Sequence, residues 1–238
     1  MKNPAAGGGR WVEVPPERLV SWIVTFGRHH GGPLAASRDE ASAAVTFTAS
    51  DGAKAHCHPP FPPLLSEPGP DAQATAEAIA AHAAANRTVG VLLVRLGGYA
   101  VGVFSGSPPC LVSSKTGRRL VHGRSAAGGW SQHRFARRRE NQAAAALRAA
   151  GDAAAAIFGP YGADGLDAVV LGGDRRSIAG LRGDARLTPY LGRATDRFLT
   201  VPDPSPAVLK DIPRAYQGIR IRLTEPELDS PGRAEPVH

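Results

Sequence analysis

The residues best suited to chemistry lie in one segment, where a glycine-rich loop is followed by a strongly basic helix start. The segment reads His122-Gly123-Arg124-Ser125-Ala126-Ala127-Gly128-Gly129-Trp130-Ser131-Gln132-His133-Arg134-Phe135-Ala136-Arg137-Arg138-Arg139. Gly128 and Gly129 allow positive φ and a close approach of the backbone to another molecule. Ser131 is a preferred N-cap residue, and the arginines after it share one helix face. The spacing of these residues by itself fits equally well a surface turn followed by a solvent-exposed charged helix.

The positive charge of the chain is concentrated around this segment. The 238 residues carry a formal net charge of +7. Lys115 to Arg148 holds nine basic residues and one acid, Glu140, so this stretch contributes +8 and the remainder sums to −1. Such an excess is expected of an element that enters a phosphate-rich site. The residues that we predict to contact RNA phosphates are Lys115, Arg118, Arg119, Arg124, Arg134, Arg137, Arg138 and Arg139.

The segment resembles the catalytic loop of the class-1 peptide release factors of eukaryotes and archaea, whose pattern is GGQSxxRFxRxR. Seven positions match at fixed spacing between Gly128 and Arg139. Trp130 stands where that family has its glutamine, and a glutamine follows two residues later, at Gln132. This displaced glutamine is similar to that of the Vms-like release factors (VLRF) in their actinobacterial form. The resemblance covers roughly half of the chain.

The resemblance implies a cytoplasmic enzyme that cleaves stalled nascent chains from tRNA, with the large-subunit rRNA of the ribosome and peptidyl-tRNA as partners and with no cofactor. Backbone N–H groups at Gly128 and Gly129 can face the developing oxyanion, and Gln132 can orient a water without titrating. We therefore predict that these three residues and Ser131 are catalytic. Trp130 either stacks on a tRNA base or packs against its own domain. His122 and His133 rank below Gln132 as participants.

The position of Gln132 leads to a structural prediction. In a helical first turn it would point about 200° around the axis from Trp130, at about 100° per residue. It could not then occupy the place of the missing family glutamine. We therefore expect Gln132 in a mobile loop rather than in a regular helix of the free protein.

Two other functions are open on the sequence alone. Members of the superfamily that lack the glutamine bind stalled ribosomes without cleaving anything, so Trp130 leaves a non-hydrolytic ribosome- or tRNA-binding rescue factor as the alternative. A nuclease needs carboxylates that converge on two metal ions. Asp164, Asp167 and Asp174 lie near one predicted strand, but the preceding strands supply no partner acid.

The sequence offers one other candidate for metal binding, His56-Cys57-His58, with His29 and His30 as further ligands. On a strand, His56 and His58 share a face while Cys57 points away, whereas zinc sites need converging ligands. We therefore predict no metal site. The two cysteines and the lack of a long apolar run predict a reducing cytoplasm, no membrane span and no signal peptide. We expect a monomer.

The elements around the loop resemble the middle domain of the release factors, which implies an RNase H-like mixed β-sheet with flanking helices. The apolar run 88–96 predicts a central strand, followed by a tight hairpin turn into 99–104. Strands at 111–114 and 118–121 continue the meander, with a turn at 115–117. A long helix follows from Ser131 to Phe158, and its predicted buried stripe consists of Ala143, Leu147, Ala150, Ala154 and Ile157.

Composition divides the chain into three parts. Residues 1–70 form a small N-terminal α+β region of unknown role, which begins with a disordered segment, 1–9, and ends in a proline-rich linker, 59–70. Residues 71–223 then form the domain that the resemblance implies is release-factor-like and catalytic, and its last segment, 217–223, is expected to alternate as a half-exposed edge strand. Residues 224–238 are expected to be a disordered tail.

Overall fold

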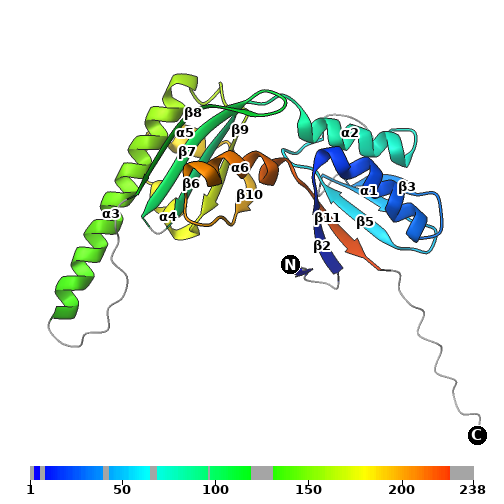
Figure 1. Cartoon of the computed structure of the whole chain (residues 1–238), viewed down its shortest axis with the longest axis horizontal. Helices are drawn as coiled ribbons and strands as arrows, with labels where there is room; N and C mark the ends of the chain where they lie inside the picture. The colour runs from blue at the N-terminus through cyan, green and yellow to red at the C-terminus, as the bar shows by residue number, and fades with distance from the viewer. Residues whose placement is uncertain are drawn as a thin grey trace, which may run out of the picture. The chain divides into compact units, whose positions relative to one another are not determined.

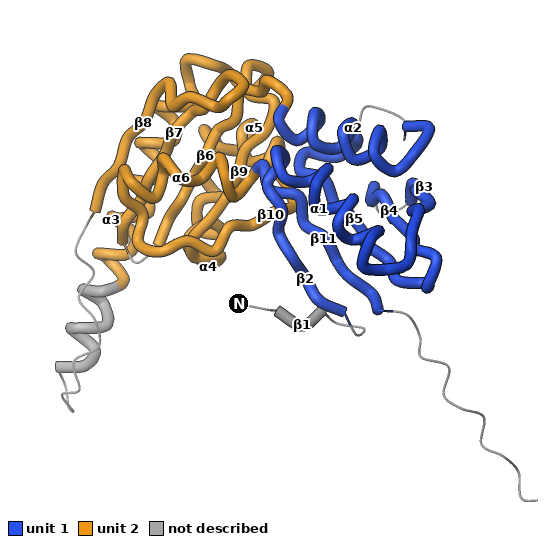
Figure 2. Tube along the Cα trace, turned by 45° about the vertical axis from the view of Figure 1, so that its right-hand side comes forward, with its two compact units in different colours: residues 1–84, 217–238 blue, residues 85–216 orange. Residues whose placement is uncertain are grey.

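The computed structural model describes residues 3–5, 9–39, 43–64, 69–95, 97–118 and 131–225, with the side chains of 3–5 and 131–139 left out of the description. The chain forms two compact units (Figures 1 and 2). The first unit is Met1–Ala84 with Gln217–His238, and the second unit is Ala85–Tyr216. This division differs from the predicted boundary at residue 70, because a helix after the proline-rich segment and the last strand both belong to the first unit.

The first unit contains a six-stranded antiparallel sheet in the order β1-β2-β11-β5-β4-β3. Its strands are β1 (Asn3–Ala5), β2 (Gly9–Val14), β3 (Ala35–Asp39), β4 (Ala44–Thr48), β5 (Lys54–His58) and β11 (Ile219–Thr224). The strand β1 lies in the segment that we expected to be disordered. The prediction of an edge strand at 217–223 is wrong, since β11 pairs with β2 on one side and with β5 on the other. Alternation of apolar and polar residues shows only that one face of a strand is covered. An inner antiparallel strand and an edge strand can both have this pattern.

Two helices cover one face of this sheet. The apolar side of α1 (Pro16–His29) and of α2 (Ala72–Ala84) packs on strand residues, in a core that includes Leu19, Ile23, Ile79, Phe47 and Ile221. Figure 1 shows α1 and α2 side by side. The buried His82 of α2 donates through Nε2 to the carbonyls of Pro60 and Phe61, at 3.0 and 3.1 Å. These bonds hold the start of the predicted linker against α2 within the first unit.

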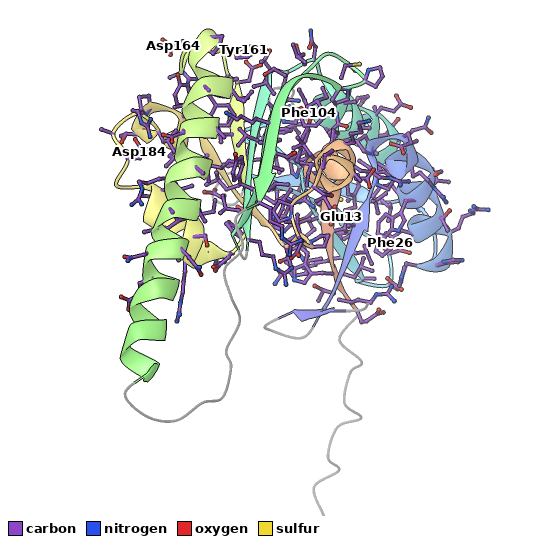
Figure 3. All side chains as sticks on the ribbon, turned by 60° about the vertical axis from the view of Figure 1, so that its left-hand side comes forward. Glu13, Phe26, Phe104, Tyr161, Asp164 and Asp184 are labelled. Carbon is purple, nitrogen blue, oxygen red and sulfur yellow. The ribbon has the colours of Figure 1, made fainter. Side chains whose placement is uncertain are left out.

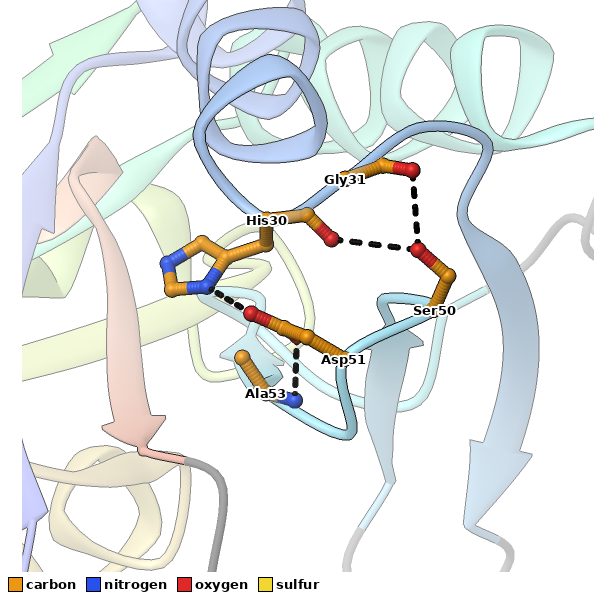
Figure 4. A network of polar contacts seen from close by, with 5 residues as sticks. All are labelled: His30, Gly31, Ser50, Asp51 and Ala53. Atoms are coloured by element: carbon orange, nitrogen blue, oxygen red, sulfur yellow. Dashed lines mark hydrogen bonds and ion pairs between the residues drawn. The ribbon is translucent and has the colours of Figure 1, made fainter. Parts of the chain in front are cut away.

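A polar network closes the end of α1 over the turn between β4 and β5 (Figure 4). His30 Nδ1 lies 2.8 Å from Asp51 Oδ2, and the Ala53 N–H donates to Asp51 Oδ1 at 2.9 Å. Ser50 Oγ donates to the carbonyls of Gly31 and His30, at 2.9 and 3.2 Å. The Ala53 N–H and the His30 ring hold the pKa of Asp51 below its usual value. His30 therefore has a structural partner in this turn.

The second unit contains a mixed five-stranded sheet in the order β10-β9-β6-β7-β8. Its strands are β6 (Val89–Arg95), β7 (Gly98–Ser105), β8 (Cys110–Arg118), β9 (Ala168–Gly173) and β10 (Ala194–Leu199). The predicted central strand and hairpin are confirmed in β6 and β7. The turn predicted at 115–117 is wrong, because β8 runs unbroken to Arg118. A Cβ at Gly117 would lie 2.4 Å from Tyr99 Oη, so this glycine provides space for a ring on β7.

Helices cover both faces of the second sheet, which confirms the predicted α/β class. One face packs on α3 (Ser131–Phe158), α4 (Arg175–Leu181) and α5 (Thr188–Leu191), and α6 (Pro206–Gln217) lies on the other. A short 3-10 turn, η1 (Gly159–Tyr161), follows α3. Successive residues of β7 face opposite sides of the sheet. Val101 and Val103 belong to the core cluster that includes α3 residues, whereas a Cβ at Gly102 would lie 3.1 Å from Leu209 of α6.

The buried side of α3 differs from the predicted stripe at its N-terminal end. Ala143 is exposed, and the buried residues of the described part are Ala146, Ala150, Gly151, Ala153, Ala154 and Phe158. The prediction holds for Ala150 and Ala154, while Leu147 and Ile157 are partly buried against the same cluster. The described part of the chain contains no helix long and apolar enough to cross a membrane.

Candidate functional site

The structure fixes the two anchors of the glycine-rich loop. The described chain leaves the second sheet at Arg118, the last residue of β8, and resumes at Ser131, the first residue of α3. Gly128, Gly129, Trp130, Arg124 and Arg119 lie outside the described residues. Register places Arg118 opposite Gly98 of β7, and Gly98 is in turn opposite Arg95 at the end of β6, which runs parallel to β9. The loop therefore starts at the carboxyl end of the parallel strands, where open α/β sheets bind ligands.

The backbone at Gln132 is helical, so the prediction that this residue lies in a loop is wrong. Helix α3 begins at Ser131 and continues for 28 residues, a length of about 42 Å. The helix starts as soon as the glycines end, because residues 131–150 contain no glycine or proline and are rich in alanine and arginine. The side chains of Ser131, Gln132, Arg134, Arg137, Arg138 and Arg139 are outside the described part, and their roles stay predictions.

Two predicted RNA-contacting residues, Lys115 and Arg118, are exposed on β8. Arg118 Nη2 lies 3.3 Å from Asp203 Oδ2 in an exposed ion pair, so part of its charge is compensated. Strand β8 is at the edge of the second sheet, so its outer side has no strand neighbour among the described residues. Lys115 thus offers an exposed cation on the strand that leads into the loop.

Two further arginines at this end of the sheet were missed by the sequence analysis. Arg175 and Arg176 begin α4 immediately after β9 and are exposed, and the guanidinium of Arg175 lies 4.4 Å from the ring centroid of Phe198. The register pairs Gly173 with Val94, which brings this helix start beside the end of β6. The signal available in the sequence was the order of a predicted strand, two glycines, Asp174 and then two adjacent arginines.

The turn between β9 and α4 requires a glycine. Gly173 has φ +101°, and a Cβ there would lie 2.2 Å from the carbonyl oxygen of Val94. The next N–H, that of Asp174, donates to the same oxygen at 2.7 Å. The Asp174 carboxylate then caps α4, accepting from Arg176 N at 3.0 Å and from Ser177 Oγ at 2.9 Å. The turn is thus held rigidly at the same end of the sheet as the base of the loop, with β6 and β7 between them.

The three acids considered for a nuclease have separate structural partners. Arg193 Nη2 donates to Asp164 at 2.5 Å, and the Thr88 N–H donates to Asp167 at 2.7 Å. Asp164 lies near the C-terminal end of α3 (Figure 3). Asp167 and Asp174 flank β9 at opposite ends, seven residues and thus about 23 Å apart along the strand. These carboxylates do not converge, so the two-metal arrangement is not supported.

The histidine and cysteine side chains around β5 point to different faces. Cys57 is fully buried in the core of the first unit, whereas His56 and His58 are half-buried on the opposite face, as predicted from strand alternation. His56 Nδ1 lies 3.0 Å from Thr46 Oγ1. Burial raises the pKa of the Cys57 thiol far above its usual value. Within the described residues, no three His, Cys, Asp or Glu side chains come together to hold a metal ion.

The mixed sheet is thus connected to a helix with a basic start through the glycine-rich segment 119–130. The family model described as "Actinobacteria/chloroflexi VLRF1 release factor" matches residues 87–222, which is more than half of the chain. The chain belongs to this family, and membership indicates a role in translation. The match ends inside β11 and leaves the first 86 residues outside.

Comparison with solved structures gives more distant similarities. One is the crystal structure of the archaeal translation termination factor aRF1, with 15% identity and a TM-score of 0.40, covering 84% of this chain and 62% of that one. Another is described as an archaeal protein, with 14% identity and a TM-score of 0.35, covering 85% and 62%. The chain thus spans 62% of the length of each of these two structures. No curated protein matches the chain.

Proposed function

We propose that the protein is a ribosome-associated peptidyl-tRNA hydrolase that releases stalled nascent chains by cleaving the peptidyl-tRNA ester. The observation that carries this proposal is the glycine-rich, arginine-rich segment of a release-factor family member, attached at the carboxyl end of the parallel strands. The net charge of +8 over 115–148 suits entry into a site made of rRNA and tRNA.

The proposed chemistry needs no nucleophilic side chain. Peptidyl-tRNA is an activated ester, so the protein has to place a water, aim it and stabilise the oxyanion. Backbone N–H groups at Gly128 and Gly129 would donate to the oxyanion, and Gln132 would accept from the water and donate to it. Ser131 would lie in the same first turn of α3 as Gln132. The arginines of the segment and Lys115 would contact phosphates, which positions the loop without reading sequence.

A second candidate is a rescue factor that binds the ribosome or tRNA without hydrolysis. Trp130 occupies the family's glutamine position, and the helical backbone at Gln132 favours this alternative. If the helix extended back to position 130, Gln132 would be rotated by about 200° from that position. Hydrolysis then requires that the ribosome rearranges the start of α3, whereas passive binding does not.

The deciding experiment is single-turnover release from stalled ribosome–nascent-chain complexes at saturating protein. We expect Gln132→Ala to slow release by about 10²–10³-fold, by analogy with the loss of one preorganised donor. Gln73→Ala removes the same side chain from the exposed surface of α2 and serves as the matched control. Co-sedimentation with ribosomes verifies that binding is intact.

The possible outcomes separate the two candidates. Release by the unchanged protein that depends on Gln132 supports hydrolysis with this glutamine in the mechanism. Release at the unchanged rate by Gln132→Ala would assign catalysis to backbone amides or rRNA. Ribosome binding without any release by the unchanged protein would establish the non-hydrolytic alternative.

A further inference from the structure

The first unit has one sheet face that its own helices leave uncovered. Both α1 and α2 pack on the opposite face, through residues such as Leu19 and Ile79 (Figure 1). Strand alternation directs the remaining side chains to the other side, which we call the open face. Its described residues on the three strands β2, β11 and β5 are Trp11, Glu13, Arg220, Arg222, Thr224, Lys54, His56 and His58.

The middle of the open face combines aromatic rings with guanidinium groups. The ring centroids of Trp11 and His58 are 5.3 Å apart with an interplanar angle of 48°. The guanidinium carbon of Arg220 lies 4.7 Å from the Trp11 centroid. Arg222 stands between Trp11 and His56, since it is the register partner of both. Surface rings beside cations are the combination with which proteins stack on nucleobases and contact the backbone of single strands.

These side chains are held in place and still reachable. Lys54 and Arg220 are exposed, while Trp11, His58 and Arg222 are half-buried. Burial, and secondarily the nearby arginines, lowers the pKa of His58, so its ring is uncharged at neutral pH. The acids of this face are Glu13 on β2, the register partner of Arg220, and Asp39 on β3. Strands β11 and β5 therefore present only cationic and neutral residues to this side.

The spacing of the cations suits an extended nucleic-acid strand. Arg220 and Arg222 are two residues apart on one strand, which separates them by about 6.8 Å. That interval is close to the distance between successive phosphates of an extended RNA chain. Lys54 lies on the adjacent strand β5, opposite Thr224 and thus two residues further along than Arg222. Open sheet faces with exposed rings bind unpaired bases, because stacked duplex bases are not accessible to them.

We propose that the open face binds a single-stranded RNA segment. Trp11 and His58 stack on bases, and Arg220, Arg222 and Lys54 contact phosphates. The site is distinct from the glycine-rich loop, and most of it lies outside the residues 87–222 that the family shares. It gives the first unit a role in binding RNA, and it does not depend on hydrolysis at the loop.

The first test measures anisotropy of a labelled 12-nucleotide RNA with the full chain across a salt series. Arg137→Ala/Arg138→Ala serves as the background, which weakens binding by the loop. In this background, Arg220→Gln/Arg222→Gln is expected to reduce the slope of log K against log salt by about 1.4, at 0.7 per lost contact. Arg18→Gln/Arg28→Gln removes two exposed charges from α1, on the other face, and should leave the slope unchanged. Equal effects of the two pairs would overturn the proposal.

The second test concerns stacking. Trp11→Leu is expected to weaken RNA binding by roughly 5- to 150-fold, with the melting temperature as the check on folding. Photo-crosslinking of the unchanged protein to a 4-thiouridine RNA, followed by peptide mapping, requires no variant. Crosslinks to the peptide that contains Trp11 or His58 support the site, and crosslinks confined to 115–148 would overturn it. Equal affinity for a 12-base-pair RNA duplex would exclude the single-strand assignment.

Peptide release is measured separately with the same variants. A protein that binds RNA through the open face and releases no peptide would contradict the proposed hydrolase function while supporting this surface. A protein that releases peptide and shows no RNA contact at the open face would support the proposed hydrolase function while contradicting RNA binding by this surface.

Discussion

Replacement of Gly173 by alanine tests whether the turn between β9 and α4 is as rigid as its contacts indicate. The added Cβ would lie 2.2 Å from the Val94 carbonyl oxygen, and φ of +101° is a conformation that alanine rarely adopts. That oxygen also accepts the Asp174 N–H at 2.7 Å, and Val94 is paired with Gly173 in the β6–β9 ladder. The clash therefore cannot be relieved without breaking backbone hydrogen bonds.

The expected cost separates into two parts. A residue held in a rarely populated backbone conformation costs about 1–3 kcal/mol. Forcing extra volume into a packed site costs about another 1–3 kcal/mol. Gly173→Ala should thus lower the free energy of unfolding of the second unit by about 2–6 kcal/mol.

Two other glycines of the second unit serve as graded controls. Gly162 has φ +63° and nothing within 4 Å of an added Cβ, so Gly162→Ala should cost only the conformational part, about 1–2 kcal/mol. Gly183 has neither a positive φ nor a close neighbour, so Gly183→Ala should be neutral or stabilise by about 0.4–1 kcal/mol. Urea unfolding, followed by circular dichroism, gives the change in the free energy of unfolding for each of the three variants. Equal losses for Gly173→Ala and Gly162→Ala would show that the β6 backbone yields, and would refute the argument for a rigid turn.

Three further predictions concern the loop, the basic helix and the first unit. Gly128→Ala/Gly129→Ala should stop peptide release while leaving the melting temperature nearly unchanged, and an unfolded double variant would assign these glycines a structural role. Arg137→Ala/Arg138→Ala should weaken ribosome binding and lower its salt-dependence slope by about two units, which sedimentation across a salt series measures; an unchanged slope would show that these side chains do not contact RNA. Burial lowers the pKa of His56 and His58 from 6.5, so the unfolded chain takes up protons first as the pH falls. The stability of the first unit should accordingly be fully present above pH 6.5 and decline below it, and His56→Asn/His58→Asn should flatten melting temperatures measured between pH 5 and 7.5.

The elements that the sequence predicted well are those set by local burial. The length and branched residues of the apolar run favoured a strand covered on both faces, which β6 is, and α3 ends at Phe158 as predicted. Strand alternation correctly separated Cys57 from His56 and His58. The loop motif with its displaced glutamine indicated the family that residues 87–222 match. Each of these signals is carried by neighbouring residues, so no knowledge of distant contacts was needed.

Strand partners were decided by the tertiary structure. The alternation of Ile219, Ile221 and Leu223 with polar residues fits either sheet, and only the pairing with β2 and β5 shows that β11 closes the first unit. Likewise, Gly117 reads as a turn residue until the Tyr99 ring is seen to occupy the space beside it. A glycine has the same local signature whether it serves a turn or a close approach.

The candidate site shows the same division. The sequence by itself determined the residue types of the loop and the concentration of charge around it, because these are properties of one continuous segment. The tertiary structure decided that α3 already includes Gln132, that Arg175 and Arg176 lie at the end of the sheet from which the loop departs, and that Trp11 and His58 share a face with Arg220. Those juxtapositions join residues far apart in the chain, and their physical cause is the hydrogen-bonded register of strands, which no local pattern encodes.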